Sequence, residues 1–145
     1  MSTANSETAI LDGIRIVEMC TGIPGPVGAL LLAEAGADVV KVEPPGGDAM
    51  RASPGFKTWN RSKRSVVLDL GNAGDRKSLD ELLAGADVLM HGMRPGVASR
   101  HRLDDATLAR QFPQLVVCSV LGYPVGHADA DRPGHDILVQ ARMGL

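Results

Sequence analysis

The chain has 145 residues, of which 44% are hydrophobic and 22% are charged, and these values are typical of one globular domain with a real core. Its 17 acidic and 15 basic residues leave a net charge of −2, which argues against a nucleic-acid partner because such proteins need a basic surface. Residues 1–8 lack the basic start and apolar centre of a signal peptide, and the longest apolar stretch, Val27–Ala33, is too short to span a bilayer, so we expect a cytoplasmic protein with no membrane partner.

Short apolar runs alternate along the chain with segments of helical periodicity. The runs that predict strands are Ile14–Met19, Asp38–Glu43, Ser65–Leu70, Asp87–Met90 and Leu115–Val120. Helices are predicted over Val27–Ala35, over Ala73–Leu83 and from Asp104 or Asp105 to Gln111. Such alternation is typical of an α/β fold in which helices cover a mostly parallel sheet.

The most informative run surrounds the second predicted strand. Asp38–Glu43 is followed at once by two prolines and two glycines, residues 44–47. Because the prolines cannot continue a central strand ladder, the chain must leave the sheet at the carboxyl end of this strand and enter a loop, predicted to run to Trp59. In open α/β sheets, that edge is where ligands bind.

Four cationic residues follow predicted strands or lie in neighbouring loops: Arg61, Lys63, Arg64 and Arg94. Arginine suits phosphate because its guanidinium presents a fixed fork of donors. Each of the four can also be interpreted as a solvated surface charge. Arg94 is the best of them for a ligand role, because it lies just past a strand's carboxyl end in a turn that Pro95 stiffens.

Two further features are the turn after the first strand and the two cysteines. Gly22–Pro26 does not match a dinucleotide fingerprint, because two prolines stand where backbone N–H groups would face a pyrophosphate. Cys20 and Cys118 lie in or beside apolar runs and are predicted to be small buried thiols.

The four histidines do not have metal-ligand spacing with one another or with the cysteines, so we expect no metal site. His101 and His127 lie in polar loops and are predicted to be solvated. His135 opens a last helical pattern, Ile137–Leu145, that ends without a cap. A histidine at that position suits a general base, and a capping or packing role stays open.

Together these segments resemble the family III CoA-transferases, a family that includes the α-methylacyl-CoA racemases. The resemblance runs from Leu11 to Leu145, and both the order and the spacing of the matching segments fit. The segments are Leu11–Glu18, Gly36–Gly47, Asn60–Leu70, Ala86–Val88, Arg94–Gly96 and Asp131–Asp136.

The resemblance implies that residues 11–145 are the N-terminal part of the family's large domain, an incomplete Rossmann-like domain that binds coenzyme A, after a disordered tail at residues 1–10. It implies coenzyme A or acyl-CoA and a carboxylic acid as substrates, no metal, and an interlaced homodimer in the complete protein. The nucleotide would lie across the carboxyl ends of the strands. By position, the residues similar to its contacts are Ile23, Pro24, Val67, Leu68, Asp69, Leu70, Met93, Arg94 and Arg100.

The chain departs from the family pattern in two places that bear on these contacts. Some relatives place an arginine just after the acid of the second strand, where this chain has Pro44. Many carry Glu-Asn-Phe where this chain has His91-Gly92-Met93.

The activity that the resemblance implies is transfer of CoA between carboxylic acids, through an aspartate that forms acyl-anhydride and aspartyl-CoA intermediates. In the family pattern that aspartate lies beyond Leu145, so this chain alone is expected to be inactive. One alternative is a 2-methylacyl-CoA racemase that uses His135, although residues 137–141 look more like the transferase version. Another is a non-catalytic chain that binds CoA or a partner.

Overall fold

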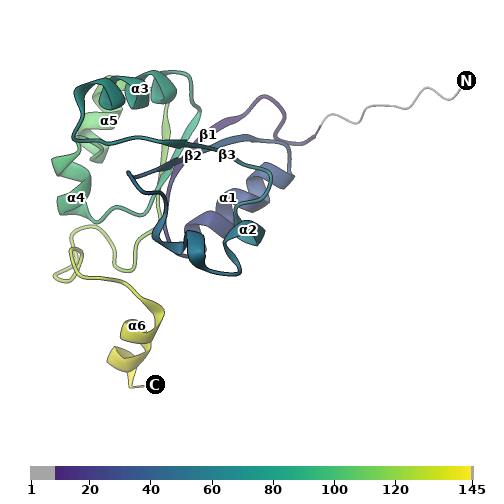
Figure 1. The fold of residues 1–145 in the computed structure, drawn as a ribbon. Helices are drawn as coiled ribbons and strands as arrows, with labels where there is room; N and C mark the ends of the chain where they lie inside the picture. The colour runs from purple at the N-terminus through teal and green to yellow at the C-terminus, as the bar shows by residue number, and fades with distance from the viewer. Residues whose placement is uncertain (1–8, 145) are drawn as a thin grey trace, which may run out of the picture.

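The computed structural model describes residues 9–144, which are built around one five-stranded, all-parallel sheet (Figure 1). The strand order is β3-β2-β1-β4-β5, and Val17 in the central strand stands opposite Val40 on one side and Leu89 on the other. The predicted α/β class with a mostly parallel sheet is confirmed. The strands are β1 (Arg15–Met19), β2 (Asp38–Glu43), β3 (Arg64–Val67), β4 (Val88–His91) and β5 (Val116–Ser119).

Helices cover both faces of the sheet: α1 and α2 lie on one side, and α3 and α5 lie on the other (Figure 1). None of the helices in the described part of the chain is long and apolar enough to cross a membrane. The helices are α1 (Pro24–Glu34), the 3-10 turn η1 (Ala49–Ala52), α2 (Phe56–Trp59), α3 (Ala73–Ala84), α4 (Pro95–Arg100), α5 (Asp105–Gln111) and α6 (Asp136–Met143).

The core consists of two apolar clusters, one on each face of the sheet. Ile16 and Val17 are neighbours in β1, but strand side chains alternate, so they enter different clusters. Ile16 shares its cluster with Ala29 of α1, whereas Val17 shares the other with Leu79 of α3. Of the residues of β1, Arg15 alone is exposed, as expected for a strand that is buried on both faces.

Two element boundaries at the carboxyl edge differ from prediction by three residues each. α1 begins at Pro24 rather than Val27, because proline fits the first helical turn, where an N–H would have no helical partner. β3 ends at Val67 rather than Leu70. There the side chain of Asp69 accepts a hydrogen bond from Gly71 N at 2.9 Å, which turns the chain away from the sheet.

Two further expectations on local structure need correction. The predicted loop at 46–59 contains η1 and α2, and the sequence pattern gave no sign of the short helix α4. The last helix does end in a cap, because Gly144 takes the left-handed conformation at φ 80°. Of the predicted tail, residues 1–8 lie outside the described residues, and the described chain begins in a turn where Asp12 N donates to Ala9 O at 3.0 Å.

The segment after β5 forms a loop whose two ends touch. A Cβ built on Gly122 would lie 2.3 Å from Gly134 Cα, so a side chain at either position would force the two backbones apart. Within the loop the buried carboxylate of Asp129 pairs with Arg132 and with Arg142 of α6. The pair with Arg142 fixes α6 to the loop.

Candidate functional site

An open cleft of about 420 Å³ lies at the carboxyl edge of the sheet. It mixes apolar side chains with a few charged and polar ones, as sites for small ligands do. Four segments line it: the end of β1 (residues 19–21), the end of β2 and its loop (42–45 and 48), the turn after β3 (68–71), and the turn after β4 with α4 and its C-cap (92–94, 97 and 101).

The wall of the cleft after β2 is a tight turn that Glu43 holds together. Gly47 N donates to Pro44 O at 2.8 Å, and Gly46 and Gly47 both have φ of 85°, a conformation that favours glycine. The carboxylate of Glu43 accepts a hydrogen bond from Asp48 N at 2.7 Å, which joins the start of the turn to its end. The predicted exit of the chain from the sheet at this point is confirmed.

Arg51 binds the same carboxylate. Its Nε and Nη2 each lie 2.6 Å from a Glu43 oxygen, a bidentate pair, and its guanidinium lies 5.1 Å from the centre of the Phe56 ring. Burial acts to raise the pKa of Glu43, but the hydrogen bonds from Arg51 and from Asp48 N outweigh it and lower the pKa. Glu43 is therefore ionised and held in place, which suits a structural carboxylate better than a catalytic acid.

Lys41 pairs with two acids beneath the cleft. Its Nζ lies 3.1 Å from Glu18 Oε1 and 3.0 Å from Asp48 Oδ2, and it donates to Cys20 O at 2.6 Å. Asp48 Oδ2 has this ion pair but no aligned hydrogen-bond donor within residues 9–144. All three charged side chains are at most 3% exposed, so none of them is available to a ligand in solution.

Lys63 completes this buried network, and both sequence-based interpretations of it are wrong. Its Nζ donates to Glu18 Oε2 at 2.9 Å, to Pro26 O at 2.8 Å and to Asn60 Oδ1 at 3.2 Å, and the side chain is only 1% exposed. It is neither a phosphate ligand nor a surface charge. With the Lys41 and Arg51 pairs, the network has three acids and three bases and so no net charge.

The cleft brings together five of the nine residues that the sequence placed near a nucleotide. They come from two turns, after β3 and after β4, and they are Leu68, Asp69, Leu70, Met93 and Arg94. The other four do not line it. Ile23 and Pro24 are exposed at the start of α1, Val67 is 53% exposed at the end of β3, and Arg100 is exposed in the last turn of α4.

Arg94 is the N-cap residue of α4, and Pro95 takes the first helical position. Arg94 Nη1 donates to the backbone oxygen of Asp131 at 2.8 Å, while the side chain of Asp131 accepts from Gly96 N at 2.8 Å. The loop after β5 thereby anchors the arginine. Within residues 9–144 this is the one hydrogen bond of its guanidinium, so most of its donors remain available at the cleft.

The structure decides the predictions for the cysteines and the loop histidines. Cys20 is buried as expected, and burial, together with the charge of Glu18, raises the pKa of its thiol to about 12. Cys118 is exposed, contrary to the prediction, because β5 is an edge strand of the described sheet. His101 is half-buried and lines the cleft rather than being solvated, whereas His127 is exposed as predicted and stacks on Tyr123.

His135 lies outside the cleft lining, exposed, at the start of α6. It is the N-cap residue, but its side chain makes no capping hydrogen bond. The sequence analysis missed His91, which is buried at the end of β4 and bonded to the turn that carries Met93. The one signal for it was the departure from the family pattern at this position.

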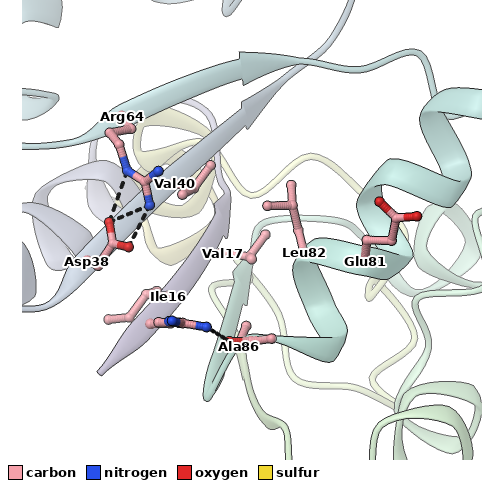
Figure 2. Close-up of a pocket in the computed structure, with 10 residues that line it drawn as sticks. Ile16, Val17, Asp38, Val40, Arg64, Glu81, Leu82 and Ala86 are labelled. Carbon is pink, nitrogen blue, oxygen red and sulfur yellow. Dashed lines mark hydrogen bonds and ion pairs between the residues drawn. The ribbon is translucent and has the colours of Figure 1, made fainter. Parts of the chain in front are cut away.

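A second cavity of about 240 Å³ opens at the opposite, amino edge of the sheet. Figure 2 shows Arg64 turned onto Asp38 beside it, with Nη2 2.7 Å and 2.5 Å from the two carboxylate oxygens. Arg61 is likewise paired with Glu34, at 2.5 Å. Of the four cations noted in the sequence, Arg94 alone lines the carboxyl-edge cleft.

The fold and the cleft together define a class of protein. An all-parallel sheet with helices on both faces and an apolar cleft at its carboxyl edge is the Rossmann-like arrangement, in which ligands bind where the strands end. An arginine beside apolar walls further suits a ligand that combines a ring with phosphate.

Comparison with known proteins identifies the family. The model for CoA-transferase family III matches residues 11–145, and the chain belongs to that family. It is 36% identical over 143 residues to the acetyl-CoA:oxalate CoA-transferase of Acetobacter aceti, covering 92% of this chain and 37% of that protein. It is 38% identical over 148 residues to the beta subunit of the succinyl-CoA–L-malate CoA-transferase of Chloroflexus aurantiacus, covering 95% and 36%.

A solved structure supports the same assignment. The crystal structure of a CAIB/BAIF family protein from Brucella suis superposes with a TM-score of 0.86 at 32% sequence identity, covering 95% of this chain and 40% of that one. The chain therefore spans less than half the length of the relatives that it matches.

Proposed function

We propose that this protein transfers coenzyme A between carboxylic acids and that the carboxyl-edge cleft binds the nucleotide part of the acyl-CoA. The observation that carries the proposal is the convergence of residues 68–70 and residues 93–94, from the turns after two separate strands, on one cleft. The apolar members suit an adenine ring, and Arg94 suits a phosphate.

In such a reaction the thioester bond of the donor breaks, a new thioester forms on the acceptor, and the donor leaves as its free carboxylate. The described residues contribute binding and orientation. The relatives named above act on acetyl-CoA or succinyl-CoA with oxalate or L-malate, so small dicarboxylic acids are the acceptors to test first. The assay incubates the purified full-length protein with either donor and each acid and follows new acyl-CoA by mass spectrometry.

The role of the cleft is tested by binding of free CoA, measured by calorimetry. A charge-assisted contact to phosphate contributes about 1.5–3 kcal/mol, so Arg94→Ala is expected to weaken CoA binding roughly tenfold or more. Arg64→Ala is the matched control, because it removes the same charge at the amino edge, where Arg64 pairs with Asp38. Equal affinities for the two variants would remove Arg94 from the site, and no binding by the unmodified protein would refute the proposed function.

A further inference from the structure

His91 is the last residue of β4 and is buried at the base of a turn that lines the cleft. The residue is 2% exposed. Met93 N donates to His91 Nδ1 at 3.2 Å, and His91 Nε2 lies 3.1 Å from Ser119 Oγ on β5. One imidazole therefore joins the turn after β4 to the neighbouring strand.

These two contacts fix the form of the ring. Because Nδ1 accepts from an N–H, the ring proton is on Nε2, which donates to the Ser119 hydroxyl. Burial lowers the pKa of His91, and the charge of Asp105 on α5 opposes that shift without cancelling it. His91 is therefore neutral at neutral pH, as an acceptor at Nδ1 requires.

Asp131 holds the far end of the turn through Arg94 and Gly96, but the start of the turn has few other constraints. Gly92 N reaches Met19 O only at 3.4 Å, and no backbone oxygen in residues 9–144 accepts from Met93 N. The side chain of His91 supplies the acceptor that the backbone does not. Without it, a partly buried N–H would lose its partner, and such a loss costs more than a typical hydrogen bond contributes.

We propose that His91 is a positioning residue for coenzyme A: its Nδ1 holds the Met93 amide, and through it the Met93 and Arg94 side chains, in the geometry that receives the nucleotide. The inference rests on the proposed function of the cleft. His91 does not line the cleft itself, so it acts through the turn.

Calorimetric titration of the purified full-length protein with CoA tests this role with four variants. His91→Asn keeps an acceptor close to the position of Nδ1, whereas His91→Gln keeps a polar group close to Nε2 but offers nothing to Met93 N. His91→Leu removes both contacts, and Ser119→Ala removes only the partner of Nε2. Thermal unfolding of each variant shows which of them fold.

We expect His91→Leu and His91→Gln to weaken CoA binding by about fivefold or more, and His91→Asn and Ser119→Ala to stay within about twofold of the unmodified protein. If His91→Leu does not fold, the contrast between the asparagine and glutamine variants decides. Equal affinities for those two would overturn the inference while the proposed function stood. If the unmodified protein did not bind CoA, the proposed function would fail and the inference with it.

Discussion

At the scale of single residues, Glu43 is ionised inside the fold because Arg51 and Asp48 N satisfy its oxygens. A carboxyl whose pKa is lower in the folded than in the unfolded chain stabilises the fold above the unfolded value, 4.5. That contribution is lost as the pH falls through the lower, folded value. Arg51→Met removes the hydrogen bonds that lower the pKa of Glu43, while burial, which raises it, remains. We therefore expect this variant to lose stability from a higher pH.

Urea unfolding midpoints measured at a series of pH values from neutral to acid check this expectation. Arg61→Met is the control, because its partner Glu34 is 40% exposed and water already solvates that carboxylate. We expect the unfolding midpoint to begin its fall at a higher pH for Arg51→Met alone. Superimposable pH profiles for the unmodified protein and Arg51→Met would show that Arg51 does not set the titration of Glu43.

At the scale of elements, Lys63 joins three parts of the chain: Glu18 in β1, Pro26 in α1 and Asn60 in the turn after α2. Removing Lys63 leaves the buried network with one acid more than it has bases, since Glu18 keeps only Lys41, and breaking a buried ion pair from one side costs about 3–5 kcal/mol. Lys63→Met is therefore expected to lower the free energy of unfolding by several kcal/mol. The exposed pair of Arg64 with Asp38 contributes only about 0–1 kcal/mol, so Arg64→Met is the control.

Chemical denaturation of both variants gives the comparison directly. A small, equal loss of stability in the two variants would show that the Lys63 pair contributes no more than a surface pair. A large loss of stability for Lys63→Met alone would show that the buried network stabilises the part of the fold beneath the cleft.

At the scale of the whole molecule, His135 separates the transferase from the racemase. It is exposed at the start of α6 and lies outside the cleft lining. In a transferase no base needs to move the α-proton of the acyl group, so His135→Ala should leave CoA transfer by the full-length protein largely intact. The measurement follows transfer by mass spectrometry and α-proton exchange in deuterated water. Rapid deuterium incorporation that His135→Ala abolishes would establish the racemase instead.

The sequence predicted what local patterns determine. Alternating apolar runs located the strands, and residues 44–47 marked the point where the chain leaves the sheet. It could not predict the role of Lys63, because its partner Glu18 lies 45 positions earlier and meets it only when β1 and the turn after α2 come together. The exposure of Cys118 likewise depends on strand order rather than on its neighbours. The homodimer and the nucleotide contacts stay predictions.

The contact between Gly122 and Gly134 has a practical consequence for labelling the protein. A loop closed at its base behaves as a surface appendage whose tip can be lengthened while its anchors stay in place. Gly126 is exposed within that loop, and a Cβ built on it would meet nothing within 4 Å. A short epitope or a fluorophore-binding tag inserted beside Gly126 would therefore report on this molecule, and binding of free CoA would show whether Asp131, which anchors Arg94 from the same loop, has kept its place.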